Sequence, residues 1–412
     1  MRCASSGGNS VSREQRKALI EAIENKRDSK VIAYVTSDRR GLEVQIAGDV
    51  VPVLHEHILA IPEAERSKLD LFLYSRGGHG DVPWSIVSMF REYCQEGSFS
   101  VLIPYRAHSA ATVIALAADE IVMTKKSELS PIDITLVGPY SEKDEDTKQR
   151  LPISVEDVKG YFSLLEKVGC KRTDEKMNAF ELLTDRVHSL ALGRVYRALQ
   201  ETELVALRLL STRATPFSEE DNRKIVEKIS SEIYSHEHAI SRTEAVEYVG
   251  LKQINNAEAE DIQIADELWN LYEQYKVLFH LEEPFTPEEH LVTNDLEEDV
   301  WTDLNLACVE SLHRVDICKQ SMRVRRLRQV PPQVQLNLTN LSVPIALPSL
   351  PAGANQQQIN ALVGQVVSTV VPQSLGNAAQ VAAQELMKAL PQAGFERFIF
   401  GAGWKEEGSD ED

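Results

Sequence analysis

The chain has 412 residues, enough for two or three domains, and its 43% hydrophobic and 26% charged residues are typical of a globular protein. Its 63 acidic and 44 basic residues give a formal charge of −19, which repels phosphate backbones and argues against nucleic-acid binding. Five scattered cysteines, without a Cys-x-x-Cys pair, argue against a disulfide framework and a zinc knuckle. Neither a run of 18 apolar residues nor a signal peptide is recognisable, so we expect a cytoplasmic protein without a membrane span.

The first 140 residues alternate between strand-like and helical patterns. Strands that alternate with helices at such short spacings predict crossover connections on a largely parallel sheet. The strand-like runs are continuously apolar, as expected where helices cover both faces of a sheet. After a charged helix at 12–27, the patterns predict strands at 30–36, 69–74, 99–104 and 120–123, and helices at 50–60, 82–93 and 110–118.

From residue 155 to 249 the pattern is helical. The first helix begins after an N-cap at Ser154, has acidic residues in its first turn and is expected to stop at Gly169. Leu- and Ala-rich helical spacing dominates residues 181–211, and shorter helices are expected near 219–235 and 241–249.

The C-terminal part of the chain changes composition twice. Residues 281–300 hold eight acidic residues and two prolines, which predicts a solvated linker. Residues 314–328 hold six basic residues. We interpret them as an amphipathic helix whose positive charges pair with the acidic segment, and contact with RNA or lipid is the alternative. Residues 331–395 hold only two charged side chains, which favours packing on a neighbour or another subunit, or a low-complexity assembly arm.

The predicted organisation therefore has four parts. They are an N-terminal helix or arm at 1–27, an α/β domain at 28–280, an acidic linker and amphipathic helix at 281–330, and a charge-poor extension with an acidic tail at 331–412.

Two chain reversals contain the candidate catalytic groups. Gly77 and Gly78 directly follow an apolar strand, and glycine permits backbone angles that leave N–H groups free to point at an anion. Ser109 stands where a later strand meets a small-residue helix, so its hydroxyl is expected at the carboxyl edge of the sheet, beside the N–H of Ala110. Each feature alone has an ordinary explanation, a tight turn and a helix N-cap. Together they contain the components of an acyl-transfer site.

A third feature follows the next strand. Asp133 comes after a turn at Pro131 and is expected near the same sheet edge, although an aspartate there is also a common turn former. The spacing SRGGHGD does not fit a dinucleotide fingerprint and the Walker lysine is missing, so no nucleotide cofactor is expected.

Three segments, SRGG, AHSAATVIALAADEIVM and ELSPID, together resemble the Clp-protease/crotonase superfamily. They are most similar to its signal-peptide-peptidase-A-like branch, the serine dehydrogenase proteinase family. The match covers residues 65–135 densely and continues more weakly to about residue 280. The resemblance implies an α/β fold with a repeated β-β-α core and helical C-terminal additions. Where family members carry Gly-Pro-Ile-Asp-Pro, this chain has Ser130 in place of the glycine and Ile134 in place of the second proline.

Carried over by position, the resemblance assigns a nucleophile and an oxyanion site. Ser109 matches the nucleophile, and Gly77, Gly78 and Ala110 match the backbone donors that face the oxyanion. Family members order their catalytic residues as Ser, Asp and His along the chain.

The resemblance also names candidates for the general base. Asp133 matches the acid, His236 is the first choice for the histidine, and His188 is the second. Either histidine alternatively lies on a helix face without a catalytic role. Signal-peptide peptidases use a Ser–Lys pair instead, and Lys159 has the spacing for it, with a solvated helix lysine as the alternative.

These assignments imply a serine endopeptidase, a hydrolase that cleaves peptide bonds through an acyl-enzyme on Ser109. No metal or cofactor is expected. The expected partners are a peptide or protein substrate and further copies of the chain, because superfamily members form homo-oligomers. Two alternatives remain: a non-hydrolytic assembly or adaptor protein on the same fold, and a crotonase-type acyl-CoA enzyme that would not need Ser109.

Overall fold

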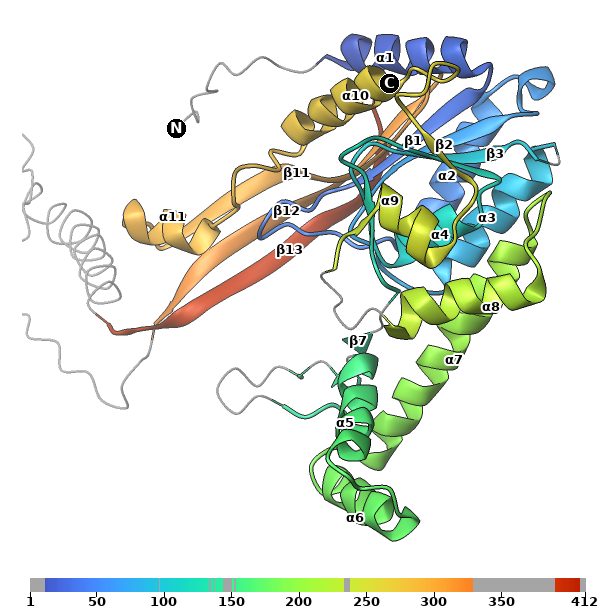
Figure 1. Ribbon diagram of the computed structural model, residues 1–412. Helices are drawn as coiled ribbons and strands as arrows, with labels where there is room; N and C mark the ends of the chain where they lie inside the picture. Colours follow the sequence, from blue (N-terminus) through green and yellow to red (C-terminus); the bar gives the residue numbers. More distant parts are fainter. Residues whose placement is uncertain are drawn as a thin grey trace, which may run out of the picture. The chain divides into compact units, whose positions relative to one another are not determined.

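Parallel strands form one side of the eight-stranded sheet in the computed structural model (Figure 1). The structure describes residues 12–95, 97–132, 135–136, 138–143, 150–151, 153–232, 238–328 and 390–407. The strands of the sheet are β1 Lys30–Thr36, β2 Leu69–Tyr74, β3 Phe99–Ile103, β5 Glu120–Met123, β10 Ile254–Asn256, β11 Glu298–Glu310, β12 Val315–Arg328 and β13 Gln392–Glu406. Their order is β10-β5-β3-β2-β1-β11-β12-β13. The first five of these run parallel, and β11 is antiparallel to β1.

The chain divides into two compact units. One comprises Met1–Phe285, Asp303–Gln320 and Gly401–Asp412, and the other comprises Thr286–Thr302 and Ser321–Phe400. The candidate site lies in the first unit.

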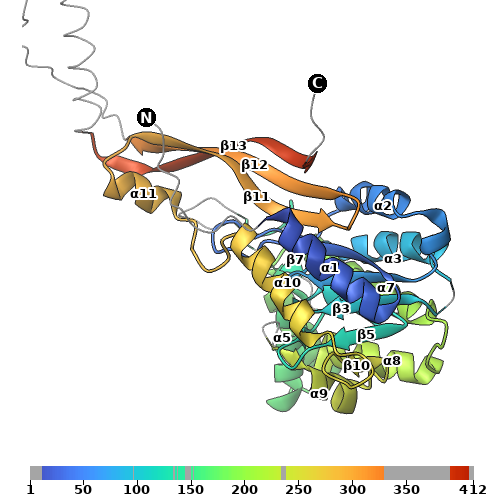
Figure 2. The ribbon, with the colours of Figure 1, turned by 90° about the horizontal axis from the view of Figure 1, so that it is seen from above.

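Helices cover both faces of the parallel strands, as the continuous apolar runs predicted. Along β1, Ile32 and Tyr34 belong to one buried cluster, and Val31, Ala33 and Val35 belong to another. Helices α1 and α10 lie side by side on the second of these faces (Figures 1 and 2). Their bounds are α1 Arg13–Arg27 and α10 Ala265–Leu278, while the other cluster takes in α2 Val50–Ala60, α3 Val82–Tyr93, α4 Ala110–Leu116, α7 Ser189–Ser211 and α8 Glu219–Glu227.

Short strands that follow the long ones build a second, small sheet. Its strands are β4 Arg106–Ala107, β6 Glu128–Leu129 and β9 Ile240–Ser241, in the order β4-β6-β9. Isolated parallel bridges pair Ser75 with Ala107 and Ile46 with Gly78. Each of β1, β2 and β3 is thus followed by a short strand or bridge and then by a helix. This is the repeated β-β-α unit of the Clp-protease/crotonase fold class that was expected.

The predicted elements of the first 140 residues agree closely with the structure, and the later helices agree in outline. The helix predicted after Ser154 ends near Gly169, whose φ is +99°. The helix predicted at 219–235 changes into a π-helical turn after α8, and the one at 241–249 is a short helix with a second π-helical turn. The remaining elements are β7 Thr135–Leu136, β8 Ile153–Ser154, α5 Val155–Lys167, α6 Thr173–Thr184, α9 Arg242–Glu244, α11 Pro287–Thr293, and one-turn segments at Glu63–Glu65, Lys228–Glu232 and Ala245–Val249.

The linker and amphipathic helix predicted at 281–330 are wrong. This segment contains the short helix α11 and all of strands β11 and β12. Burial along β12 has a period of two, with Met322 and Val324 buried and Arg323 and Arg325 exposed, which is the periodicity of a strand. The basic residues do pair with the acidic segment, as in the ion pair between Arg328 and Glu297.

The charge-poor extension predicted at 331–412 falls mainly outside the described residues. Its described part, residues 390–407, includes β13, which lies beside β12 in the sheet. The acidic residues at 408–412 also lie outside the described part of the chain.

Candidate active site

Ser109 occupies the turn between β4 and α4 with an unusual backbone conformation. Its φ is 51° and its ψ is −116°, a combination that costs a residue other than glycine about 1 to 3 kcal/mol. All seven residues of α4 are buried, whereas Ser109 itself is half-buried and within reach of solvent. Its side chain makes no capping hydrogen bond to α4. The ordinary explanation of this serine as a helix N-cap therefore does not account for it.

The glycine turn after β2 packs directly against Ser109. Gly77 has a φ of +99°, and a Cβ placed on it would lie 2.6 Å from both the carbonyl oxygen of His108 and the Cβ of Ser109. Gly78 is equally confined, since its Cβ would lie 2.2 Å from the carbonyl oxygen of Ile46. The two chain reversals that the sequence singled out therefore meet at Ser109.

The backbone N–H groups at this junction are not equivalent. The N–H of Gly77 donates to the Oγ of Ser75 at 3.0 Å, and the same oxygen accepts from the hydroxyl of Thr36 at 2.8 Å. Within the described part of the chain, the N–H groups of Gly78 and Ala110 have no acceptor. This arrangement leaves Gly78 and Ala110 free to donate to a bound oxygen, and it makes Gly77 a packing residue.

The backbone N–H of Ser109 is held from the other side. It donates to the Oγ of Ser130 at 2.8 Å. Nothing in the sequence marks Ser130 as a partner of this turn, because its hydrogen bond to Ser109 joins segments that meet only in the folded chain. The bond between Gly77 and Ser75 is local, since these residues are two positions apart.

Two of the predicted triad residues, Asp133 and His236, lie outside the described residues. The strands that precede and follow them are described, and they form the antiparallel pair of β6 and β9, in which Leu129 lies opposite Ile240. In an antiparallel pair, the segment that leaves β6 and the segment that enters β9 lie at the same end of the ladder.

The second-choice base and the alternative lysine lie in the helical additions. His188 is the N-cap of α7, where its Nδ1 accepts the N–H of Leu190 at 3.1 Å. Its ring stacks on that of Tyr140, with 4.7 Å between the ring centroids. Lys159 is half-buried in α5.

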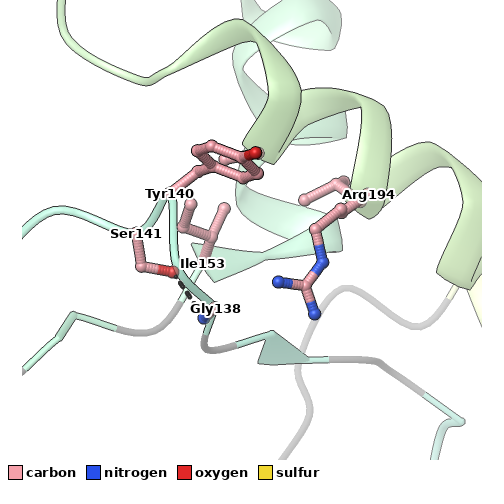
Figure 3. Close-up of a pocket in the computed structure, with 7 residues that line it drawn as sticks. Gly138, Tyr140, Ser141, Ile153 and Arg194 are labelled. Atoms are coloured by element: carbon pink, nitrogen blue, oxygen red, sulfur yellow. Dashed lines mark hydrogen bonds between the residues drawn. The ribbon is translucent and has the colours of Figure 1, made fainter.

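A small pocket lies beside the start of α7 (Figure 3). The guanidinium of Arg194 lies against Gly138, where an added Cβ would come within 1.9 Å of Nη1. A turn holds this loop in place, because the N–H of Gly138 donates to the Oγ of Ser141 at 3.0 Å. The pocket was not predicted; its lining comprises Gly138, Tyr140, Ser141, Ile153, Ala191, Arg194 and Val195.

Charged side chains from β4 and β6 lie beside the residue before the serine. His108 places its Nε2 3.2 Å from an oxygen of Glu128, and Arg106 donates to the same oxygen at 2.9 Å. Burial and nearby arginines together lower the pKa of His108 to about 4, although Glu128 opposes the shift. His108 is therefore neutral at pH 7.

The fold and the site define an α/β protein with a strained serine at a junction of two backbone loops. No protein-family model matches the chain. In sequence it is similar to two uncharacterized proteins of Methanocaldococcus jannaschii. One is 24% identical over 270 residues, 63% of this chain and 78% of the relative. The other is 23% identical over 231 residues, 55% of this chain and 68% of the relative.

Among solved structures, the chain is similar to a mutant form of a membrane-bound stomatin-specific protease, with a TM-score of 0.29, 15% identity, and coverage of 55% of this chain and 81% of that one. It is also similar to a probable enoyl-CoA hydratase/isomerase from Mycobacterium abscessus, with a TM-score of 0.27, 10% identity, and coverage of 65% and 84%.

Two features are absent from the residues that the structure describes. No group of His, Cys, Asp and Glu side chains there is arranged to hold a metal ion. No helix in the described part of the chain is long and apolar enough to cross a membrane.

Proposed function

We propose that the protein is a serine endopeptidase whose nucleophile is Ser109. The observation that carries this proposal is the backbone of Ser109, which has a φ of 51° at the start of a fully buried helix and a side chain that does not cap that helix. Strained backbone conformations are retained mainly at functional sites, because a relaxed conformation would make the protein more stable. The sequence resemblance to the serine dehydrogenase proteinase family favours a peptide as substrate.

The backbone donors have a defined role in this proposal. The Oγ of Ser109 adds to the carbonyl carbon of the scissile peptide bond, and its proton passes to a general base. The N–H groups of Gly78 and Ala110 then donate to the oxyanion of the tetrahedral intermediate. One such donor typically contributes about a hundredfold to a thousandfold in rate. The base returns the proton to the leaving amine, and water then hydrolyses the acyl-enzyme.

We assign the general base to His236, oriented by Asp133. The support is the resemblance, together with the antiparallel pairing of β6 with β9, in which Leu129, before Asp133 in the chain, lies opposite Ile240, after His236. Ser130, three positions before Asp133, already contacts the backbone of Ser109. His188 is the second candidate, although its Nδ1 already accepts the backbone N–H of Leu190 at the start of α7. Lys159 is the third candidate.

A fluorophosphonate probe followed by intact-protein mass spectrometry tests the nucleophile. We expect one label on the wild type, no label on Ser109→Ala, and full labelling of Ser127→Ala. Ser127 is the control because its hydroxyl is buried and is used within the fold, where its Oγ accepts the backbone N–H of Thr124 at 2.7 Å. An unlabelled wild type, or equal labelling of Ser109→Ala, would overturn the proposal and favour a non-hydrolytic adaptor protein.

Labelling rates separate the three candidate bases. His236→Ala should slow labelling about a thousandfold or more, as loss of a triad histidine does in known proteases. His188→Ala and Lys159→Ala should leave the rate within about threefold of the wild type. A greater loss in either of the latter two variants would move the assignment of the base to that residue.

We further propose that the protein forms a homo-oligomer, as the resemblance implies. Multi-angle light scattering on the full-length protein measures the number of copies. A monomer at micromolar concentration would contradict this proposal without affecting the assignment of Ser109.

A further inference from the structure

Ser130 is placed to control the conformation of Ser109. It is 1% exposed, and its Oγ accepts the backbone N–H of Ser109 at 2.8 Å. The hydroxyl hydrogen of Ser130 is used elsewhere, since it is donated to the carbonyl of Pro131 at 2.9 Å. The oxygen therefore presents a lone pair, and not a hydrogen, to the N–H of Ser109.

The backbone of Ser130 is held in place by helix α4 itself. The backbone N–H of Ser130 donates to the Oγ1 of Thr112 at 3.1 Å, and that hydroxyl donates to the carbonyl of Ala107 at 2.8 Å. Thr112 is fully buried. The nucleophile lies on the segment from Ala107, at the end of β4, to Thr112 in α4. Ser130 hydrogen-bonds to both Ser109 and Thr112 and so closes a hydrogen-bonded loop around the nucleophile.

This loop acts on the torsion angle that is strained. The angle φ of Ser109 is a rotation about its N–Cα bond, and its reference is the peptide plane that contains the N–H. A hydrogen bond to that N–H fixes the plane from which the Oγ of Ser109 is positioned. Without it, Ser109 is free to relax from a φ of 51° toward ordinary backbone angles, and its hydroxyl turns away from the donors at Gly78 and Ala110.

We propose that Ser130 is a positioning residue for the nucleophile, a role that rests on the proposed function of Ser109. Ser130 does not contact substrate in this proposal. It affects how often the hydroxyl of Ser109 points at a bound carbonyl, and not how tightly the carbonyl binds.

The test compares Ser130→Ala and Ser130→Gly with Ser127→Ala, using the rate and the affinity of fluorophosphonate labelling as separate readouts. Both Ser130 variants should lower the maximal labelling rate about tenfold to a hundredfold, the equivalent of one buried hydrogen bond, with the half-saturating probe concentration unchanged. Ser127→Ala loses a hydrogen bond of the same kind and should keep the wild-type rate. The pH dependence of labelling should keep its midpoint in all variants, because none of them changes the base.

Ser130→Thr keeps the hydroxyl and should restore at least part of the rate. Hydrogen exchange of the Ser109 amide gives a readout without chemistry, and we expect faster exchange in Ser130→Ala than in Ser127→Ala. Wild-type labelling rates in both Ser130→Ala and Ser130→Gly would overturn this inference and leave the proposed function intact. An unlabelled wild type would overturn both.

Discussion

Gly77 and Ser109 are in such close contact that a methyl group on Gly77 would lie 2.6 Å from the Cβ of Ser109. Gly77→Ala should therefore displace the serine, and its φ of +99° adds backbone strain of about 1 kcal/mol or more. We expect fluorophosphonate labelling to fall at least about a hundredfold. Gly48→Ala is the control, because a Cβ there has open space around it. Equal labelling rates of the two variants would show that the contact does not position the nucleophile.

The strain at Ser109 predicts an increase in stability when the nucleophile is removed. Glycine adopts a positive φ without steric cost, so Ser109→Gly should raise the free energy of unfolding by about 1 kcal/mol over Ser109→Ala. Urea denaturation monitored by circular dichroism measures the difference. If Ser109→Gly is the less stable of the two, the turn is not strained in solution.

The neutral state of His108 predicts a loss of stability in mild acid. Its pKa is about 4 in the folded protein and 6.5 in an exposed histidine, so between these values the unfolded chain binds a proton that the folded chain does not. This contribution to stability is complete above pH 6.5 and is lost as the pH falls toward 4. His108→Gln should reduce the loss between pH 7 and pH 5 by about 1 to 2 kcal/mol.

The control for this experiment is His280→Asn, since the side chain of His280 is 60% exposed and its φ of 52° suits asparagine. Urea titrations at both pH values give the free energies of unfolding. A wild type and a His108→Gln variant with the same pH dependence would contradict the prediction.

A buried ion pair joins α1 to β11. Glu310 accepts from the Nε of Arg16 at 2.6 Å and from the hydroxyl of Tyr275 at 2.9 Å, and both members of the ion pair are buried. Glu310→Ala leaves the guanidinium without its counter-ion and should cost about 3 to 5 kcal/mol. The double variant Arg16→Met, Glu310→Met removes both charges and should be destabilised less.

The matched control is the solvent-exposed pair of Lys224 and Glu220, which are 2.6 Å apart on α8. Glu220→Ala should change the free energy of unfolding by about 0.5 kcal/mol or less. If the double variant of Arg16 and Glu310 loses as much stability as Glu310→Ala, the buried charge does not explain the loss.

The parallel core was predictable because its signals are local. Strands β1 and β2 are predominantly apolar runs, with Asp70 as the one charged residue inside β2, and the bounds predicted for them are those observed. Helix α10 was missed although the sequence contained its signal, since Leu268, Leu271, Tyr272 and Tyr275 recur at the helical spacing. Strand β11 was missed for a physical reason. It is stabilised by pairing with β1, in which Ala33 lies opposite Glu310, and no local pattern reports a partner so distant in sequence.

The residues of the site also fall into those with a local signal in the sequence and those without one. Gly77 and Ser109 were found because turns and helix starts leave local signatures in a sequence. The role of Ser130 was not found, because a buried hydroxyl accepts whichever N–H the fold brings to it. The role of Ser75 was missed although its signal is local, a serine two positions before a glycine in a turn. The same contacts show that Gly77, predicted as an oxyanion donor, gives its N–H to Ser75.

Helix α4 has a consequence for how the protein loses activity. All seven of its residues, from Ala110 to Leu116, are buried, and it carries the serine at its first turn. Such a segment exchanges its amide hydrogens only when the surrounding structure opens cooperatively, and it does not fray separately. The serine therefore stays on the slowest-exchanging part of the chain, and heat should abolish its reactivity and the protein's circular dichroism signal at one temperature.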